Sequence, residues 1–368
     1  MKIACIVGAR PNFMKIAPIL VEFKKYPNLD PLLIHTGQHY DYEMSQVFFD
    51  ELDIPKPDVY LNVGSGSHAV QTAKIMMAFE ETVNEHKPDL VLVVGDVNST
   101  MACAIVSAKL CIPVIHVEAG IRSFDKTMPE EVNRILTDVI SDYLFTPIEE
   151  ANENLRKEGI SEDKIFLVGD IMIDTLLKYK EKASSSKILN ELGLEKQSYA
   201  IMTLHRPSNV DVRPNLINIL DAVDAIQQKI KIVLAIHPRT RARIKEFGLE
   251  DKVSGMKNLI ITDPLGYLEF MGLTINAKFA LTDSGGMQTE TTVLNIPCLT
   301  MRENTERPET LRDGTNTLVG NDTKLIIEES MKILDEKGKS GTYPKIWDGH
   351  TAVRVVDILY KQVRSGKF

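Results

Sequence analysis

The chain has 368 residues, of which 43% are hydrophobic and 26% charged, values typical of a globular protein whose length suggests two domains. Its formal net charge of -8 argues against nonspecific nucleic-acid binding, which needs a basic surface. No apolar run approaches the ~20 residues of a membrane helix, and the apolar start of the chain is too short for a signal sequence. We therefore expect a cytoplasmic protein without a membrane or nucleic-acid partner.

The four cysteines show no metal-binding or disulfide pattern. They lie in separate apolar segments, and none forms a Cys-x-x-Cys pair. We expect all four to be buried free thiols in a reducing compartment. They are Cys5, Cys103, Cys111 and Cys298.

The first half of the chain alternates short apolar strands with stretches of helical spacing. This alternation predicts a parallel sheet covered by helices on both faces. The polar stretch 180–187 loses the periodicity and is the best candidate for a linker. Strands are expected at 2–7, 32–36, 90–94, 113–117, 143–146 and 165–168, and helices at 13–25, 42–52, 68–86, 99–109, 130–140, 148–157 and 171–182.

The alternation then restarts and predicts a second domain of the same kind. An amphipathic stretch at 352–363 ends the chain. The expected fold class is α/β, with two Rossmann-like doubly wound domains. Ligands of such sheets bind beyond the carboxyl ends of the strands, so the turns after strands deserve most weight. Strands are expected near 199–204, 231–236, 258–261, 278–282 and 297–300.

The turn after the first strand contains two cations. Arg10 lies in the turn and Lys15 one helical turn later, which suits a pyrophosphate, although two surface cations without a ligand are the simpler alternative. The turn lacks the Gly-x-Gly-x-x-Gly pattern, which disfavours a dinucleotide cofactor.

Three carboxylates follow the next strands of this half. Asp96 is expected to be available because Asn98 or Ser99 can cap the helix that follows. Glu118 ends an apolar strand, where a carboxylate is costly unless it is used or paired, with Arg122 as one structural partner. Glu130 begins a helix after Pro129, where the helix dipole alone favours an acidic residue.

The second half offers histidine, arginine and glycine in the corresponding turns. The sequence Asp283-Ser-Gly-Gly-Met-Gln-Thr-Glu290 lies between a strand and a helix. Two glycines let backbone N–H groups approach an anion at a helix N-terminus, and the later carboxylate suits a ribose. With His205 and Arg307, this half looks like a nucleotide site. Carboxylates of the first half would then face a sugar on the phosphates, where they stabilise positive charge and move protons.

These residues, in this order, make the chain resemble the non-hydrolysing UDP-N-acetylglucosamine 2-epimerases. The resemblance covers nearly the whole chain and is specific because so many motifs are in register. The motifs are GARPNFMK (8–15), HTGQH (35–39), GDVNST (95–100), HVEAGIRS (116–123), MPEEVNR (128–134), TLHR (203–206), HPRT (237–240), DPLGYLEF (263–270), DSGGMQTE (283–290) and TERPE (305–309).

The resemblance implies a glycosyltransferase-B-like fold in which two Rossmann-like domains face each other across a cleft. The expected limits are 1–182 for the first domain, 183–348 for the UDP-binding domain, and 349–368 for a C-terminal helix that packs back on the first domain. It further implies a homodimer that interconverts UDP-GlcNAc and UDP-ManNAc in polysaccharide biosynthesis. UDP is eliminated to give 2-acetamidoglucal and then added back, with no metal or other cofactor.

The resemblance also implies roles for particular residues, by motif position. Glu290 would bind the ribose, Phe270 would lie near the uracil, and Ser284, Gly285 and Gly286 would cradle the phosphates. The expected catalytic residues are Asp96, Glu118, Glu130 and His205; the expected substrate-binding residues are Arg10, Lys15, Arg206, His237, Phe270, Ser284, Gly285, Gly286, Glu290 and Arg307.

Four other functions fit parts of the pattern. A sister branch acts on UDP-2,3-diacetamido-glucuronic acid and shares most motifs; the stretches 38–42 and 237–241 fit that branch as well, and an additional basic contact for the uronate would favour it. A hydrolysing epimerase would release ManNAc and UDP. A retaining glycosyltransferase would need an acceptor groove, and a UDP-sugar sensor would not need the carboxylates.

Overall fold

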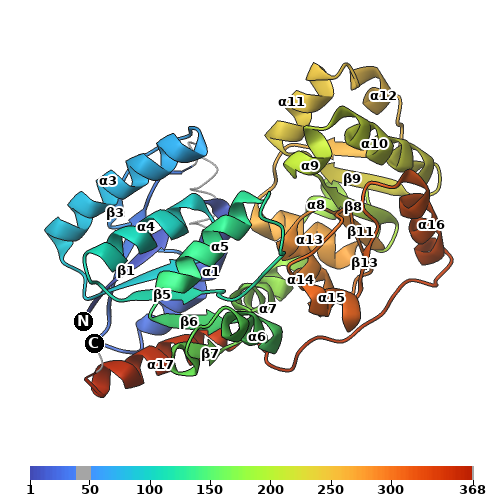
Figure 1. Ribbon diagram of the computed structural model, residues 1–368. Coiled ribbons are helices and arrows are strands. Elements are labelled where there is room, and N and C mark those ends of the chain that lie inside the picture. Colours follow the sequence, from blue (N-terminus) through green and yellow to red (C-terminus); the bar gives the residue numbers. More distant parts are fainter. Residues whose placement is uncertain (39–50, 367–368) are drawn as a thin grey trace. The chain divides into compact units, whose positions relative to one another are not determined.

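A computed structural model describes residues 1–38 and 51–366 of the chain, except for the side chain of Arg10. The chain forms two compact units, which we call unit 1 (1–178 with 344–368) and unit 2 (179–343). These limits differ by a few residues from the domain limits expected above. Figure 1 shows the elements of both units.

Unit 1 is built on a parallel sheet that is doubly wound. In the described residues its seven strands have the order β3-β2-β1-β4-β5-β6-β7. The direction of winding reverses between β1 and β4, and ligands of such sheets bind beyond the carboxyl ends at that point. The strands are β1 (Lys2–Val7), β2 (Asp30–His35), β3 (Val59–Tyr60), β4 (Leu90–Val94), β5 (Val114–Val117), β6 (Tyr143–Thr146) and β7 (Ile165–Leu167).

Helices follow most of these strands and bury their apolar sides against the sheet. A core cluster joins Ala4 and Ile6 of β1 to Ile75 and Phe79 of α3, all at most 2% exposed. A short 3₁₀ turn (Glu162–Lys164) precedes β7. The helices are α1 (Arg10–Phe23), α3 (His68–His86), α4 (Asn98–Lys109), α5 (Pro129–Ile140), α6 (Glu149–Lys157) and α7 (Ile171–Ser184), the last crossing the limit between the units.

The C-terminal helix, α17 (Thr351–Arg364), belongs to unit 1 and packs on α1. The Tyr26 hydroxyl donates to Asp357, and the rings of Tyr26 and Tyr360 lie 5.0 Å apart. Asp174 of α7 accepts the first backbone N–H groups of α17, at 3.0 and 2.7 Å. Through these contacts the C-terminal helix α17, drawn in red in Figure 1, packs against the N-terminal part of the chain.

Unit 2 repeats the doubly wound plan. Its strands, counted in the described residues, have the order β10-β9-β8-β11-β12-β13, all parallel, so the winding reverses between β8 and β11. Thr203 and Thr282, the last residues of β8 and β11, are in register. The strands are β8 (Tyr199–Thr203), β9 (Lys231–Ala235), β10 (Leu259–Thr262), β11 (Phe279–Thr282), β12 (Cys298–Thr300) and β13 (Asn316–Leu318).

Alternate residues of these strands face opposite layers of helices. Ala200 and Met202 lie in the cluster that includes α10 and α16, whereas Tyr199 and Ile201 lie in the cluster that includes α13 and α14. This is the period of two that a sheet buried on both faces requires. The helices are α8 (Ile188–Glu191), α9 (Pro207–Val210), α10 (Arg213–Gln227), α11 (Pro238–Glu246), α12 (Glu250–Ser254), α13 (Tyr267–Asn276), α14 (Gly285–Val293), α15 (Pro308–Arg312) and α16 (Thr323–Leu334).

The predicted α/β class with two doubly wound sheets is confirmed, but two short strands were missed and two local predictions are wrong. The short strands β3 and β13 were not predicted. The stretch 180–187 is helical as far as Ser184, so it is not an open linker. Cys111 is exposed because it lies in the turn after α4; the other three cysteines are buried and free. The predicted helix 42–52 and the stretch 38–42 lie largely outside the described residues.

Among the helices of residues 1–38 and 51–366, none combines the length and the apolarity needed to cross a membrane.

Candidate active site

The carboxyl edge of the unit 1 sheet gathers several of the predicted residues. Asp96 and Glu118 follow β4 and β5, which are neighbours in the sheet, and α1 with Lys15 begins just after β1. Carboxyl ends of parallel strands meet at one edge, so these groups lie close together. Arg10 opens α1, but its side chain lies outside what the structure describes.

Glu118 occupies a strained position and is paired with a lysine. Its φ of 77° lies in the left-handed region, which is unusual for a residue other than glycine and is found at functional sites. Its carboxylate accepts a hydrogen bond from Nζ of Lys15, and both side chains are less than 10% exposed. The structural partner considered above, Arg122, instead contacts Asp138 and Glu158, so that alternative is wrong.

Asp96 is held by an arginine and remains partly exposed. Arg134 of α5 donates to Oδ2 of Asp96 from Nε and from the terminal nitrogen, at 3.0 and 2.6 Å. About a quarter of the Asp96 side chain is accessible to solvent. The expected caps are wrong: α4 has no side-chain cap, and Asn98 and Ser99 donate to other side chains.

Two adjacent glutamates at the start of α5 have different environments. Glu131 is 1% exposed and accepts the backbone N–H groups of Ser123 and Phe124, at 3.0 and 2.9 Å, so it has a structural role. Glu130 is partly exposed at the same helix end. Of the two, Glu130 is therefore the one accessible to a ligand.

A buried histidine and aspartate join the turns that bear Asp96 and Glu118. The ring of His116 has Asp138 Oδ1 at 2.6 Å from Nδ1 and the Gly95 carbonyl at 2.8 Å from Nε2. Both ring nitrogens are thus in contact with groups inside the protein. Burial alone raises the pKa of Asp138, but His116, Arg122 and the Gly120 N–H together lower it below its ordinary value. The pair therefore fixes the two turns from inside the unit.

The corresponding edge of unit 2 contains a second histidine–aspartate pair. Nδ1 of His205, after β8, lies 3.0 Å from Oδ1 of Asp283, after β11. Asp283 is fully buried and also accepts the backbone N–H groups of His205 and Arg206, at 2.9 and 2.8 Å. The His205 side chain is 36% exposed. The ring of His237, which follows β9, lies 5.6 Å from the His205 ring.

The two glycines at the start of α14 have different surroundings, as the position of an added Cβ shows. A Cβ on Gly285 would overlap Oε1 of Glu306, so the Glu306 side chain would have to shift. A Cβ on Gly286 would approach only Oγ of Ser284, at 4.0 Å, among the described residues. Gly286 therefore leaves open space at the N-terminus of α14, where an anion is favoured. Ser284 is the N-cap residue there, and its side chain makes no capping bond.

The remaining predicted residues of unit 2 lie on its helices or at their N-termini. Glu290 of α14 is 8% exposed and accepts a hydrogen bond from the Tyr267 hydroxyl at 3.4 Å. Phe270, on α13, is partly buried against the core. Arg206 lies 3.7 Å from Glu306, and Arg307 is the buried N-cap residue of α15.

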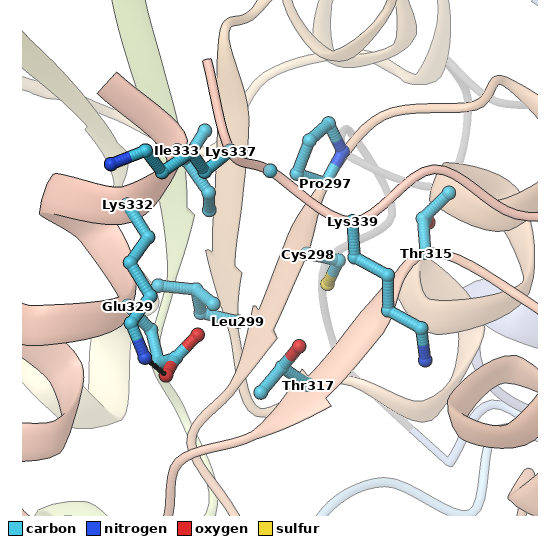
Figure 2. Close-up of a pocket in the computed structure, with 11 residues that line it drawn as sticks. Pro297, Cys298, Leu299, Thr315, Thr317, Glu329, Lys332, Ile333, Lys337 and Lys339 are labelled. Carbon is cyan, nitrogen blue, oxygen red and sulfur yellow. Dashed lines mark hydrogen bonds and ion pairs between the residues drawn. The ribbon is translucent and has the colours of Figure 1, made fainter. Parts of the chain in front are cut away.

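Two cavities of the described residues are lined by none of the predicted catalytic and substrate-binding residues. One, of about 300 Å³, lies at the amino ends of β12 and β13, where Figure 2 shows Cys298, Thr315 and Lys339 on its wall. The other, of about 370 Å³, is lined by Pro238, Asp263 and neighbours. Within the described ranges, no cluster of histidine, cysteine or acidic side chains is placed to hold a metal ion.

Asp283, Asp138 and Arg134 also belong to these sites, although they were not predicted from the sequence. Asp283 directly follows a buried strand, which is the same signal that singled out Glu118. Asp138 and Arg134 lie within a helix, and only their tertiary contacts identify them.

Comparisons with known proteins agree with the motifs. A family model described as UDP-N-acetylglucosamine 2-epimerase matches residues 21–360. A Methanococcus maripaludis UDP-N-acetylglucosamine 2-epimerase homolog is 48% identical over 98% of this chain and 99% of its own. A Pseudomonas aeruginosa UDP-2,3-diacetamido-2,3-dideoxy-D-glucuronate 2-epimerase is 42% identical over 90% and 91% of the two chains. The crystal structure of Methanocaldococcus jannaschii UDP-GlcNAc 2-epimerase in complex with UDP-GlcNAc and UDP matches with a TM-score of 0.92 and 44% identity, covering 98% of this chain and 100% of that one.

Proposed function

The chain belongs to the UDP-N-acetylglucosamine 2-epimerase family, and from that premise we propose that it interconverts UDP-GlcNAc and UDP-ManNAc by inversion at C2. The observation that carries the proposal is the match over nearly its whole length to the Methanocaldococcus enzyme complexed with UDP-GlcNAc and UDP. The charged groups after the strands of both sheets support it.

The proposed reaction is non-hydrolysing and needs no cofactor. The C2–H bond breaks and its electron pair forms the C1=C2 double bond of 2-acetamidoglucal, while the C1–O bond pair leaves with UDP. Because the C2 proton is not acidic, departure of this anionic group must assist its removal. Addition of UDP to the glucal, with a proton delivered to the other face of C2, completes the inversion.

In this proposal, unit 1 supplies charge and proton transfer to the sugar. Asp96, Glu118 and Glu130 are the catalytic carboxylates, and Arg10 and Lys15 bind the diphosphate. The Lys15–Glu118 contact supports this assignment, because a lysine shared between a carboxylate and a phosphate couples substrate binding to the charge of that carboxylate.

In the same proposal, unit 2 binds the nucleotide. Ser284, Gly285 and Gly286 cradle the diphosphate with Arg206, His237 and Arg307, while Glu290 binds the ribose and Phe270 lies near the uracil. The open space beside Gly286 supports the phosphate assignment. His205 is the catalytic histidine.

The uronate substrate is the second candidate, and the Pseudomonas relative supports it. A uronate carboxylate needs an additional basic contact, and the three arginines of α11 lie in or beside the stretch 237–241 that fits that branch. Each of them is already paired: Arg239 and Arg243 with Asp211, and Arg241 with Asp263. This pairing favours UDP-GlcNAc.

We also propose a cytoplasmic homodimer. Three apolar side chains, Val132, Leu136 and Val139, are exposed on one face of α5 at helical spacing. A second copy of the chain is the expected partner for this face. Sedimentation analysis should give a dimer for the wild type and a monomer for Leu136→Glu; a monomeric wild type would contradict this part.

The deciding experiment is proton NMR of the purified protein with UDP-GlcNAc in D₂O, without added metal or acceptor. We expect UDP-ManNAc to appear with deuterium at C2. Free ManNAc and UDP would instead establish the hydrolysing reaction. No change with UDP-GlcNAc, but turnover of the diacetamido-uronic acid substrate, would establish the second candidate.

The site assignment has its own test. Asp96→Asn, Glu118→Gln and His205→Ala should each abolish most epimerisation while circular dichroism remains unchanged. Asp322→Asn is the matched control, because Asp322 only caps α16 at an exposed position. Full activity in all three folded variants would refute the assignment.

A further inference from the structure

The register between β8 and β11 brings His205 and Asp283 together, at the point where the winding of the unit 2 sheet reverses. Thr203 ends β8 and Thr282 ends β11, and these paired residues also join their hydroxyls at 2.6 Å. Asp283 follows immediately, and His205 comes two residues after Thr203. Both residues of the pair thus lie in the turns directly after two paired strands.

The two oxygens of Asp283 share the backbone N–H of His205, which lies 3.2 Å from Oδ1, but differ in their other partners. Oδ2 accepts the backbone N–H groups of His205 and Arg206, at 2.9 and 2.8 Å, and lies 3.2 Å from Nδ2 of Asn209. Oδ1 lies 3.0 Å from Nδ1 of His205. Burial alone raises the pKa of Asp283, but His205 and the backbone donors lower it to about 2. The carboxylate is therefore ionised, and Nδ1 must donate to it.

The other ring nitrogen of His205 has a different environment. Within residues 1–38 and 51–366, no group makes a hydrogen bond to Nε2, and the side chain is 36% exposed. A histidine whose Nδ1–H is held by a carboxylate presents either a lone pair or a proton at Nε2, as the reaction requires.

From this geometry we propose that Asp283 is a positioning residue that keeps a proton on Nδ1 of His205 and makes Nε2 the nitrogen that exchanges a proton with the substrate. When Nε2 accepts a proton, the ring becomes an imidazolium whose charge Asp283 balances. When Nε2 returns that proton, the neutral Nδ1–H form is restored. The proton-transfer step rests on the proposed function; the assignment of the Nδ1 proton does not.

The substitution Asp283→Asn tests the proposal because it can keep the shorter backbone hydrogen bonds while changing the group that faces Nδ1 of His205. The amide oxygen can take the place of Oδ2 and keep both backbone bonds. The NH₂ group then faces Nδ1 of His205 and donates to it, so the proton of the neutral ring moves to Nε2. The opposite amide orientation would place NH₂ against two backbone N–H donors and is disfavoured.

The first readout is ¹⁵N NMR of histidine-labelled protein, with His205 assigned through His205→Gln. We expect a protonated Nδ1 in the wild type and, at alkaline pH, an unprotonated Nδ1 in Asp283→Asn. An unprotonated Nδ1 in the wild type overturns the proposal without any variant. The same protonated Nδ1 in a folded Asp283→Asn protein also overturns it.

The second readout is steady-state kinetics with UDP-GlcNAc. We expect kcat to fall at least about 10²-fold in Asp283→Asn, with KM changed by only about threefold or less, because proton transfer and not binding is affected. Asp322→Asn is the matched control: Oδ1 of Asp322 accepts two backbone N–H groups in the same unit, and its kcat should be unchanged. Wild-type kcat in Asp283→Asn overturns the positioning role. A wild type inactive on UDP-GlcNAc refutes the proposed function, while the NMR result still decides the Nδ1 assignment.

Discussion

Each unit contains a histidine paired with a fully buried aspartate, His116 with Asp138 and His205 with Asp283, yet the surroundings of the two pairs differ. His116 and Asp138 are completely buried, and both ring nitrogens of His116 are bonded within the protein. His205 is partly exposed, and only its Nδ1 is bonded to a carboxylate. A histidine whose two ring nitrogens are both bonded within the protein is held in place, whereas a histidine with an exposed ring nitrogen can contact a ligand.

The largest effect expected for the two pairs is the loss of activity when His205 is replaced by glutamine. His205→Gln should lower kcat by about 10²–10⁴-fold, because glutamine carries no exchangeable proton at the required pKa, while folding is kept. The measurement is the rate of UDP-ManNAc formation, with circular dichroism as the folding control. A folded His205→Gln protein with wild-type kcat would remove the distinction.

The buried pair should instead respond in stability. Asp138→Ala leaves His116 and Arg122 without their shared carboxylate in the core. This loss should lower the free energy of unfolding by about 3–5 kcal/mol. Urea unfolding followed by fluorescence reports on unit 1, because the single tryptophan, Trp347, is buried there. Thr240→Ser, a conservative change in unit 2, should leave this transition in place. An unchanged midpoint for Asp138→Ala would show that the pair has no structural role.

The two glycines of α14 show a similar contrast, because a Cβ on Gly285 would meet a side chain whereas a Cβ on Gly286 would lie in open space. Gly285→Ala should destabilise unit 2 by about 1–3 kcal/mol because its Cβ meets Glu306. Gly286→Ala should fold normally but bind UDP more weakly. Calorimetric titration with UDP and thermal unfolding distinguish the two, and equal UDP affinity for wild type and Gly286→Ala would contradict the phosphate assignment.

The smallest effect concerns acid stability. The pKa of Asp283 in the folded protein is about 2, below the ordinary value. The ionised carboxylate therefore contributes fully to the stability of unit 2 above about pH 4, and this contribution is lost as the pH falls toward 2. We expect the free energy of unfolding of unit 2 to decrease by about 2 kcal/mol between pH 4 and pH 2. Hydrogen–deuterium exchange of β8 and β11 peptides at pH 5 and pH 2 measures the loss. Asp283→Asn should remove this dependence, and an equal loss in that variant would contradict the assignment.

Local patterns were sufficient for most elements of the fold. The strands 2–7, 90–94 and 143–146 and the helix 68–86 have the limits that periodicity predicts. The strands β3 and β13 were missed because two or three residues contain too little periodicity, and their pairing with β2 and β12 defines them. Helix α7 extends through a polar stretch for which the sequence contains no apolar signal.

By itself, the sequence determined the α/β class, the strand-end positions of Asp96, Glu118, His205 and Ser284, and the family, because short-range patterns and motif order contain that information. Only the tertiary structure decided which charges are paired. It paired Lys15 with Glu118, Arg134 with Asp96 and Asp283 with His205, residues separated by 38 to 103 positions. Such pairs form where strands and helices distant in sequence meet, and their burial and second partners, set by packing, distinguish the histidine that stabilises from the one equipped to react.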